Sequence, residues 1–193
     1  TVEVYAADQL TAGNQSEGIQ AVMDGSTQLS AHSNLIYSAF DQRLNVVSLP
    51  FLFDSFDDVD AKLDGDAGKA VGEVVESMGL HLLGIAENGF RHPTNSKHPI
   101  ESLADMKGLK IRVPGSEVYM GVFRQFGADP VAMSWSEVFT ALQQGTIDAA
   151  ENAICAYSHI AVAQQLHPLR SQLQPVALRI KYQIIISQTV IFL

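Results

Sequence analysis

Short apolar runs alternate with amphipathic segments along this chain of 193 residues, and glycine or proline residues separate many of them. A short apolar run is typical of a buried strand, whereas apolar residues three or four positions apart are typical of one helix face. Their alternation predicts an α/β fold with right-handed crossovers between parallel strands. A ligand of such a fold lies beyond the carboxyl ends of the strands.

The expected helices have recognisable ends. The longest helical pattern covers 57–78, with a break near 64–66. Ser134 and Glu137 have the spacing of a capping box, in which each side chain binds the backbone amide of the other residue, and this helix is expected to end at Gln144. Other helices are expected over 16–24, 102–106, 117–126 and 153–165.

The expected strands differ in how deeply they are buried. Residues 80–86 are almost continuously apolar, which predicts a strand covered on both faces. Residues 1–5 alternate polar and apolar side chains and fit an exposed or edge strand. Further strands are expected over 27–32, 109–113, 130–133, 146–150 and 182–187.

Charge and composition exclude several classes of partner. The chain has 12 Lys and Arg residues against 21 Asp and Glu residues, for a net charge of −9. So acidic a chain is a poor general binder of phosphate, which argues against nucleic acid and anionic membranes as partners. No run approaches the ~20 apolar residues of a membrane-spanning helix. A local basic pocket for a small anion remains compatible with this composition.

The motifs of common enzymes and metal sites are absent. The sequence has no G-x-S-x-G, H-E-x-x-H or G-x-G-x-x-G motif, and the glycines at 65–68 lack the P-loop spacing. Cys155 is the single cysteine, so neither an internal disulfide nor a cysteine-based zinc cluster can form. We therefore expect no metal, no cofactor and no catalytic residue.

Three polar residues stand out by their positions in the expected sheet. Arg112 lies inside one strand near its carboxyl end, while Arg91 and Asn152 follow two others, so all three are expected at the rim of the sheet. An arginine there can hold a carboxylate with two parallel hydrogen bonds. For each residue taken alone, a surface ion pair or a helix cap is the simpler explanation; their shared placement at the rim leaves both interpretations open.

Several segments in a fixed order resemble the solute-binding proteins of TRAP transporters, the DctP-like family. They are K-G-L-K-I-R-V-P-G-S at 107–116, G-A-D-P-V-A-M-S-W-S-E-V at 127–138, T-A-L-Q-Q-G-T-I-D at 140–148 and E-N at 151–152. Similar segments lie upstream at 49–53, 87–92 and 94–97. The resemblance extends from Val2 to about Ser187.

The resemblance implies a two-lobed periplasmic solute-binding-protein fold of type II-like α/β architecture, incomplete in this chain. The expected first lobe is 1–86, the second lobe is 87–177, and 178–193 returns to the first lobe as a strand. In the family, a further strand and helix precede the position of Thr1, and the long helix across the lobes follows that of Leu193. We therefore expect this chain alone to be marginally stable or to aggregate, because apolar edges would be exposed.

The implied function is capture of an organic acid, either a sugar acid or a C4-dicarboxylate, in the periplasm, and its delivery to a membrane permease. The full-length precursor would carry a signal peptide. By the family's motifs, Arg112 grips the ligand carboxylate, Arg91 is a second arginine and Trp135 packs against the ligand. The remaining expected ligand contacts are Asn152 of the family's E-N-P motif, in which Ala153 replaces the proline, and His32 and Asn14 of the first-lobe loops.

Two alternatives use the same pocket. An enzyme could act on an organic acid anchored by Arg112, but its acid, base or nucleophile would have to come from Glu87, Glu151 or the pair of Cys155 and His159. A sensor lobe could bind the same ligand without transporting it. We predict a binding protein rather than an enzyme.

Overall fold

The computed structural model describes residues 1–153 and the backbone of residues 186–192. The described strands form one six-stranded sheet with the order β1-β6-β2-β5-β3-β4. Their bounds are β1 (Ser30–Ser33), β2 (Leu82–Asn95), β3 (Lys110–Val113), β4 (Asp129–Ala132), β5 (Ala149–Ala153) and β6 (Ile186–Phe192).

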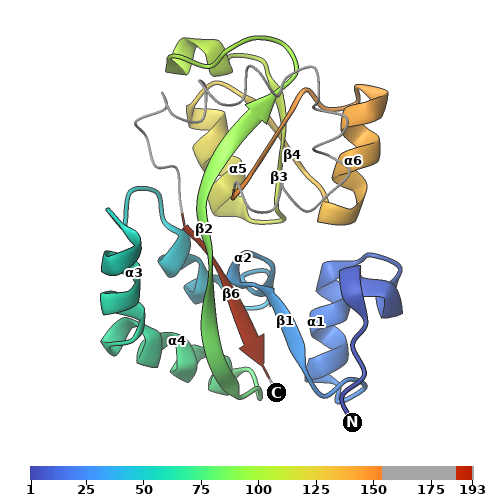
Figure 1. The fold of residues 1–193 in the computed structure, drawn as a ribbon, viewed down its shortest axis with the longest axis vertical. Helices are drawn as coiled ribbons and strands as arrows, with labels where there is room; N and C mark the ends of the chain where they lie inside the picture. The colour runs from blue at the N-terminus through green and yellow to red at the C-terminus, as the bar shows by residue number, and fades with distance from the viewer. Residues whose placement is uncertain (154–185, 193) are drawn as a thin grey trace.

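Strand β2 runs through both parts of the molecule, as Figure 1 shows. It pairs antiparallel with β6 as far as Phe90 and antiparallel with β5 from Arg91 onward. We call residues 1–90 together with β6 the first half, and residues 91–153 the second half. Parallel pairing occurs only among β3, β4 and β5 in the part of the chain described. The sheet is therefore mixed rather than parallel throughout.

Each half has a hydrophobic core, and Leu35 of the first half packs into the core of the second. In the first half, helices and strands pack around Ile19, Tyr37 and Val75. In the second half, one cluster surrounds Ile111 and Phe123, and a smaller one lies under the last described helix. First-half helices are η1 (Ala6–Thr11), α1 (Gln15–Met23), α2 (Asn34–Tyr37), η2 (Gln42–Ser48), α3 (Phe56–Leu63) and α4 (Asp66–Ser77), and second-half helices are η3 (Leu103–Met106), α5 (Glu117–Gln125) and α6 (Trp135–Gln144).

Most helix predictions are confirmed, because their signals are local. The break near 64–66 separates α3 from α4, and Ser134 with Glu137 forms the capping box that begins α6. Gly145 ends α6 in the left-handed conformation, at φ 69°. The expected helix over 153–165 lies outside the described residues from 154 onward. The expected strand over 182–187 lies outside them as far as 185, and its last two residues are the first two of β6.

One expected strand is absent, and two others have limits that differ from those predicted. Residues 1–5 have no regular structure. The strand expected over 80–86 continues to Asn95, because pairing with β5 supplies hydrogen bonds to its polar second part. Its apolar part is not covered on both faces, since Leu83 is 51% exposed.

The strand expected over 146–150 begins three residues later, at Ala149. The amide of Thr146 completes the end of α6 by donating to the carbonyl of Ala141, at 3.0 Å. We had expected Arg91 and Asn152 to follow strands, but they lie inside β2 and β5. The domain boundaries at residues 86 and 177 stay predictions.

Two glycines of α4 should respond to alanine in opposite directions. A Cβ at Gly68 would lie 1.8 Å from the carbonyl oxygen of Leu63, whereas a Cβ at Gly72 would meet only the Leu82 side chain at 3.7 Å. We expect Gly72→Ala to stabilise the protein by about 0.5–1 kcal/mol, because alanine favours the helix. Gly68→Ala should destabilise it by roughly 1–3 kcal/mol, because the two helices must move apart.

Chemical denaturation of both variants measures these changes in the free energy of unfolding. Equal stabilisation by the two alanines would show that α3 and α4 do not pack as described.

Candidate functional site

Arg112 lies in β3, at the centre of the second-half sheet, and is only 3% exposed. Its Nε donates to the carbonyl of Met133, at 2.8 Å, just after β4. Its guanidinium carbon lies 5.3 Å from the centroid of the Trp135 ring, at the start of α6. The cation–π contact and the hydrogen bond together orient the guanidinium group. The side chain is therefore held against α6 and does not extend into bulk solvent.

Arg91 forms a buried ion pair with Glu151. Its Nε contacts Oε2 of Glu151, and its Nη2 donates to Oε1 of Glu151 and to the Glu151 carbonyl, both at 2.9 Å. Arg91 is 4% exposed and Glu151 is 1% exposed. The carboxylate of Glu151 compensates the arginine charge, and the pair ties β2 to β5.

Tyr119 of α5 lies beside this ion pair. The guanidinium carbon of Arg91 is 5.7 Å from the centroid of its ring. Its hydroxyl is buried without a hydrogen-bond partner among the described residues. Burial raises the pKa of the Tyr119 hydroxyl well above its usual value, so the group stays a neutral phenol.

The strand register separates the two arginines. Arg112 is the neighbour of Ala150 on β5, so Arg112 lies on the face that Ala150 shares with Asn152. Arg91 is opposite Ala153, which places Arg91 and Glu151 on the other face of the same strand.

The packing agrees with this register. Ala150 belongs to the cluster under α6, while Tyr119 of α5 packs on the opposite face. The structure therefore brings Arg112, Asn152 and Trp135 to one side of the sheet and places Arg91 on the other.

Asn152 and His92 are paired across β5 and β2. Asn152 is buried, and its Oδ1 accepts from the amide of Ala153, at 2.8 Å. Burial lowers the pKa of the His92 imidazole, so its neutral form is favoured beside the asparagine. This part of the α6 face presents polar groups that carry no negative charge.

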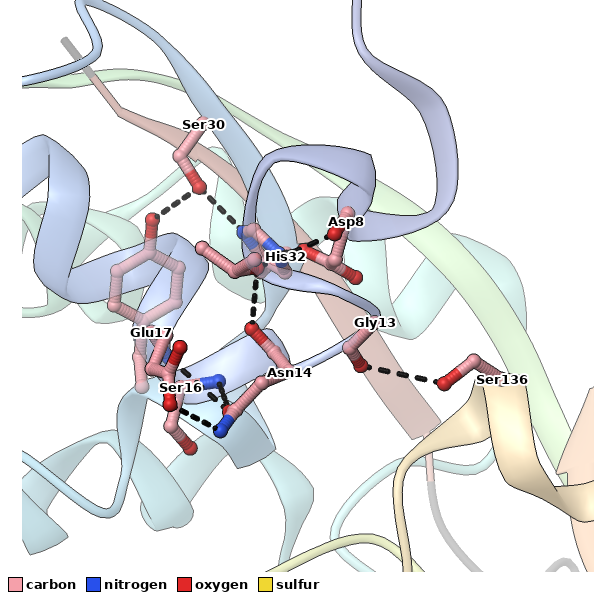
Figure 2. Close-up of polar contacts among 10 residues, drawn as sticks. Asp8, Gly13, Asn14, Ser16, Glu17, Ser30, His32 and Ser136 are labelled. Carbon is pink, nitrogen blue, oxygen red and sulfur yellow. Dashed lines mark hydrogen bonds and ion pairs between the residues drawn. The ribbon is translucent and has the colours of Figure 1, made fainter.

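In the first half, His32 of β1 lies in a chain of polar contacts (Figure 2). Its Nε2 is 2.5 Å from Oδ1 of Asp8, and its Nδ1 is 2.5 Å from Oγ of Ser30. The hydroxyl of Tyr37 donates to the same Oγ, at 3.0 Å. His32 thus anchors η1 to β1 through Asp8.

Asn14 is the N-cap of α1. Its Oδ1 accepts from the amides of Ser16 and Glu17, at 3.1 and 3.2 Å, and its Nδ2 donates to Oε1 of Glu17, at 2.9 Å. The side chain is exposed and acts as a helix cap in this structure. A contact between Asn14 and a ligand stays a prediction.

Two hydrogen bonds join the halves near these residues. Ser116 is the N-cap of α5, and its Oγ donates to Oδ1 of Asn45 in η2, at 3.0 Å; both side chains are buried. Ser136 Oγ donates to the carbonyl of Gly13, at 3.3 Å (Figure 2). The candidate residues of both halves therefore lie around one junction.

Several features of the candidate site were not found from the sequence. Asp8 as the partner of His32, Tyr119 beside Arg91, and the contacts across the junction depend on residues far apart in the chain. Only Glu151 had a signal, since it stands next to Asn152 in the E-N segment.

Within 1–153 and 186–192, no three His, Cys, Asp or Glu residues are grouped so that they could hold a metal ion. None of the helices described has the length and apolar character needed to cross a membrane. Cys155 and His159 lie outside the described residues.

Comparison with known proteins identifies a family. A family profile described as "Bacterial extracellular solute-binding protein, family 7", named DctP, matches residues 1–177. The chain is 36% identical over 144 residues, 75% of its length, to the 2,3-diketo-L-gulonate-binding periplasmic protein YiaO of Escherichia coli. It is 35% identical over 134 residues, 69% of its length, to the C4-dicarboxylate-binding periplasmic protein DctP of Vibrio cholerae.

A similar solved structure is a TRAP periplasmic solute-binding protein from Roseobacter denitrificans with bound β-D-glucuronate. It has a TM-score of 0.82 and 29% sequence identity, and the match covers 95% of this chain and 57% of that one. The matches cover 44% of the E. coli protein and 40% of the V. cholerae protein, so this chain spans less than half the length of either relative.

The buried Arg91–Glu151 pair should dominate stability in this region. Glu151→Leu or Arg91→Met alone should destabilise the protein by about 3–5 kcal/mol, because each leaves a buried charge without its partner. The double variant should lose less than the sum of the two single variants. Lys69→Gln, which removes an exposed ion pair with Asp66, is the control and should leave stability unchanged.

Denaturant unfolding of the four variants measures the coupling. Additive effects of Arg91→Met and Glu151→Leu would contradict a direct buried ion pair.

Proposed function

Because this chain belongs to the DctP family, bacterial extracellular solute-binding protein family 7, we propose that its protein captures an organic acid in the periplasm for a TRAP transporter. The family and its similar structures are ligand-binding transport proteins, not enzymes. Two relatives are named as periplasmic, which supports the proposed location. Delivery of the ligand to membrane permease subunits is part of the same proposal.

A carboxylate is the shared chemistry of the relatives' ligands. Diketo-gulonate, C4-dicarboxylates and glucuronate all carry at least one carboxylate group, and the last is bound in a solved structure. We propose a sugar acid or a C4-dicarboxylate as the ligand here. The hydroxyl groups or second carboxylate of such a ligand would then require polar partners in addition to Arg112.

The fixed guanidinium of Arg112 carries this proposal. Stacking on Trp135 and the bond from Nε to Met133 orient the terminal nitrogens Nη1 and Nη2, which would bind the two carboxylate oxygens. Asn152 lies on the same face and would bind a further ligand oxygen. A site that is already oriented loses little conformational entropy when the ligand binds.

The remaining predicted contacts have different roles in the proposal. His32 and Asn14 would approach the ligand from the first half. Arg91 lies on the other face with Glu151, and we propose that it fixes β5 beside Asn152 rather than binding the ligand as the second arginine. As the halves close and exclude water, each charge-assisted hydrogen bond becomes stronger.

An enzyme anchored by the same arginine finds less support. Glu151 is held in the ion pair with Arg91, and Glu87 is exposed on β2 in the part that pairs with β6. Neither carboxylate lies free beside Arg112. Release of a bound acid unchanged would exclude turnover, and a new product in the mixture would favour the enzyme.

Arg112 should be indispensable for ligand binding. Arg112→Ala should weaken binding of the organic acid by about 2–5 kcal/mol, because the carboxylate loses its charged partner in a site without water. Arg112→Lys should weaken it too, since an ammonium group cannot form two parallel hydrogen bonds to one carboxylate. Arg124→Lys, at the exposed end of α5, is the matched control and should bind normally.

Calorimetry on the protein as its gene encodes it, titrated with D-glucuronate, D-galactonate and succinate, measures these affinities. Unchanged affinity in both Arg112 variants would refute the assignment. Failure of the wild-type protein to bind any organic acid would refute the function itself.

A further inference from the structure

Gly13 and Ser136 meet across the two halves although 123 positions separate them. Gly13 lies between η1 and α1 in the first half, and Ser136 is in the first turn of α6 in the second half. Figure 2 shows the Ser136 hydroxyl directed at the Gly13 carbonyl, with a distance of 3.3 Å between the two oxygens.

A side chain at position 13 would crowd Ser136 while the halves stand this close. A Cβ on Gly13 would lie 2.7 Å from Oγ of Ser136 and 3.2 Å from its Cβ. The φ of Gly13 is +86°, which glycine adopts without the steric cost that other residues incur. Two separate features, the backbone conformation and the close approach, therefore favour glycine here.

The segment that carries Gly13 is fixed to the first half. The amide of Gly13 donates to the carbonyl of Asp8, at 2.9 Å, and the side chain of Asp8 binds His32 of β1. Gly18 of α1 leaves room for this anchor, because a Cβ there would lie 2.8 Å from Oδ1 of Asp8. Gly13 therefore cannot easily move aside as α6 approaches.

Position 136 is directly coupled to the proposed ligand site. Ser136 follows Trp135, whose ring stacks on the guanidinium of Arg112. Any change in the distance between Gly13 and α6 also changes the distance between the first half and this arginine.

We propose that the contact of Gly13 with Ser136 is the closing contact of the ligand site, and that the absence of a side chain at Gly13 determines how far the halves close. This proposal rests on the proposed function and adds positioning residues to it. A Cβ at position 13 would hold the halves apart. The ion pair between Arg112 and the carboxylate of the ligand would then stay partly hydrated. The ligand would then dissociate faster.

Gly25 provides a matched control. It has a similar left-handed backbone, with φ +76°, but a Cβ there would meet nothing within 4 Å. Gly13→Ala and Gly25→Ala therefore introduce similar backbone strain, and only the first introduces a contact across the halves. We expect Gly13→Ala to accelerate dissociation of the bound acid at least about tenfold relative to Gly25→Ala.

A distance measurement separates closure from folding. Spin labels at Gln20 of α1 and Gln143 of α6, both exposed, report the separation of the halves once Cys155 is replaced by serine. Calorimetry identifies which of D-glucuronate, D-galactonate and succinate binds most tightly, and that acid is added at a saturating concentration. The distance should shorten in the wild type and in Gly25→Ala, and remain longer in Gly13→Ala.

A second-site change tests the steric argument. Ser136→Gly removes both atoms that the new Cβ would meet, so Gly13→Ala with Ser136→Gly should recover closure and slow dissociation. If Gly13→Ala matches Gly25→Ala in dissociation rate and in distance, the proposed closing contact is wrong while ligand binding stands. If the wild type binds none of the acids, the proposed function fails instead.

Discussion

One continuous strand, β2, holds both halves of the sheet in place. Its pairing partner changes from β6 to β5 between Phe90 and Arg91, without an intervening loop. A register irregularity at Glu87 and Gly89, where Gly89 has φ +105°, lies just before this change. A bulge bends its strand and increases the local twist, so the orientation of the second half relative to the first depends on these few residues.

The same strand explains why two arginines of similar sequence context have different environments. Successive side chains of a strand point to opposite faces, and the registers of β2, β3 and β5 place Arg91 and Arg112 on different sides. Arg91 is paired with Glu151 inside the protein, whereas Arg112 lies against the Trp135 ring and donates to the Met133 carbonyl.

Local signals accounted for most of the helices. The capping box at Ser134, the break between α3 and α4 and the left-handed Gly145 depend on residues within one turn of each other. Strand limits were less predictable, because the polar second part of β2 is a strand only through its hydrogen bonds to β5. The importance of Arg112, Asn152 and Trp135 was predicted from their motifs, and their common face came from the register.

The sequence by itself determined the α/β class, the family and the residue types of the proposed carboxylate site, because helix caps, apolar runs and linked motifs are encoded within short stretches of chain. The tertiary structure alone decided which charges are already paired, which side chains share a face and where the halves meet. Glu151 neutralises a residue 60 positions away, and Gly13 meets one 123 positions away. Such distances are set by the packing of the whole sheet, which no local pattern of residues contains.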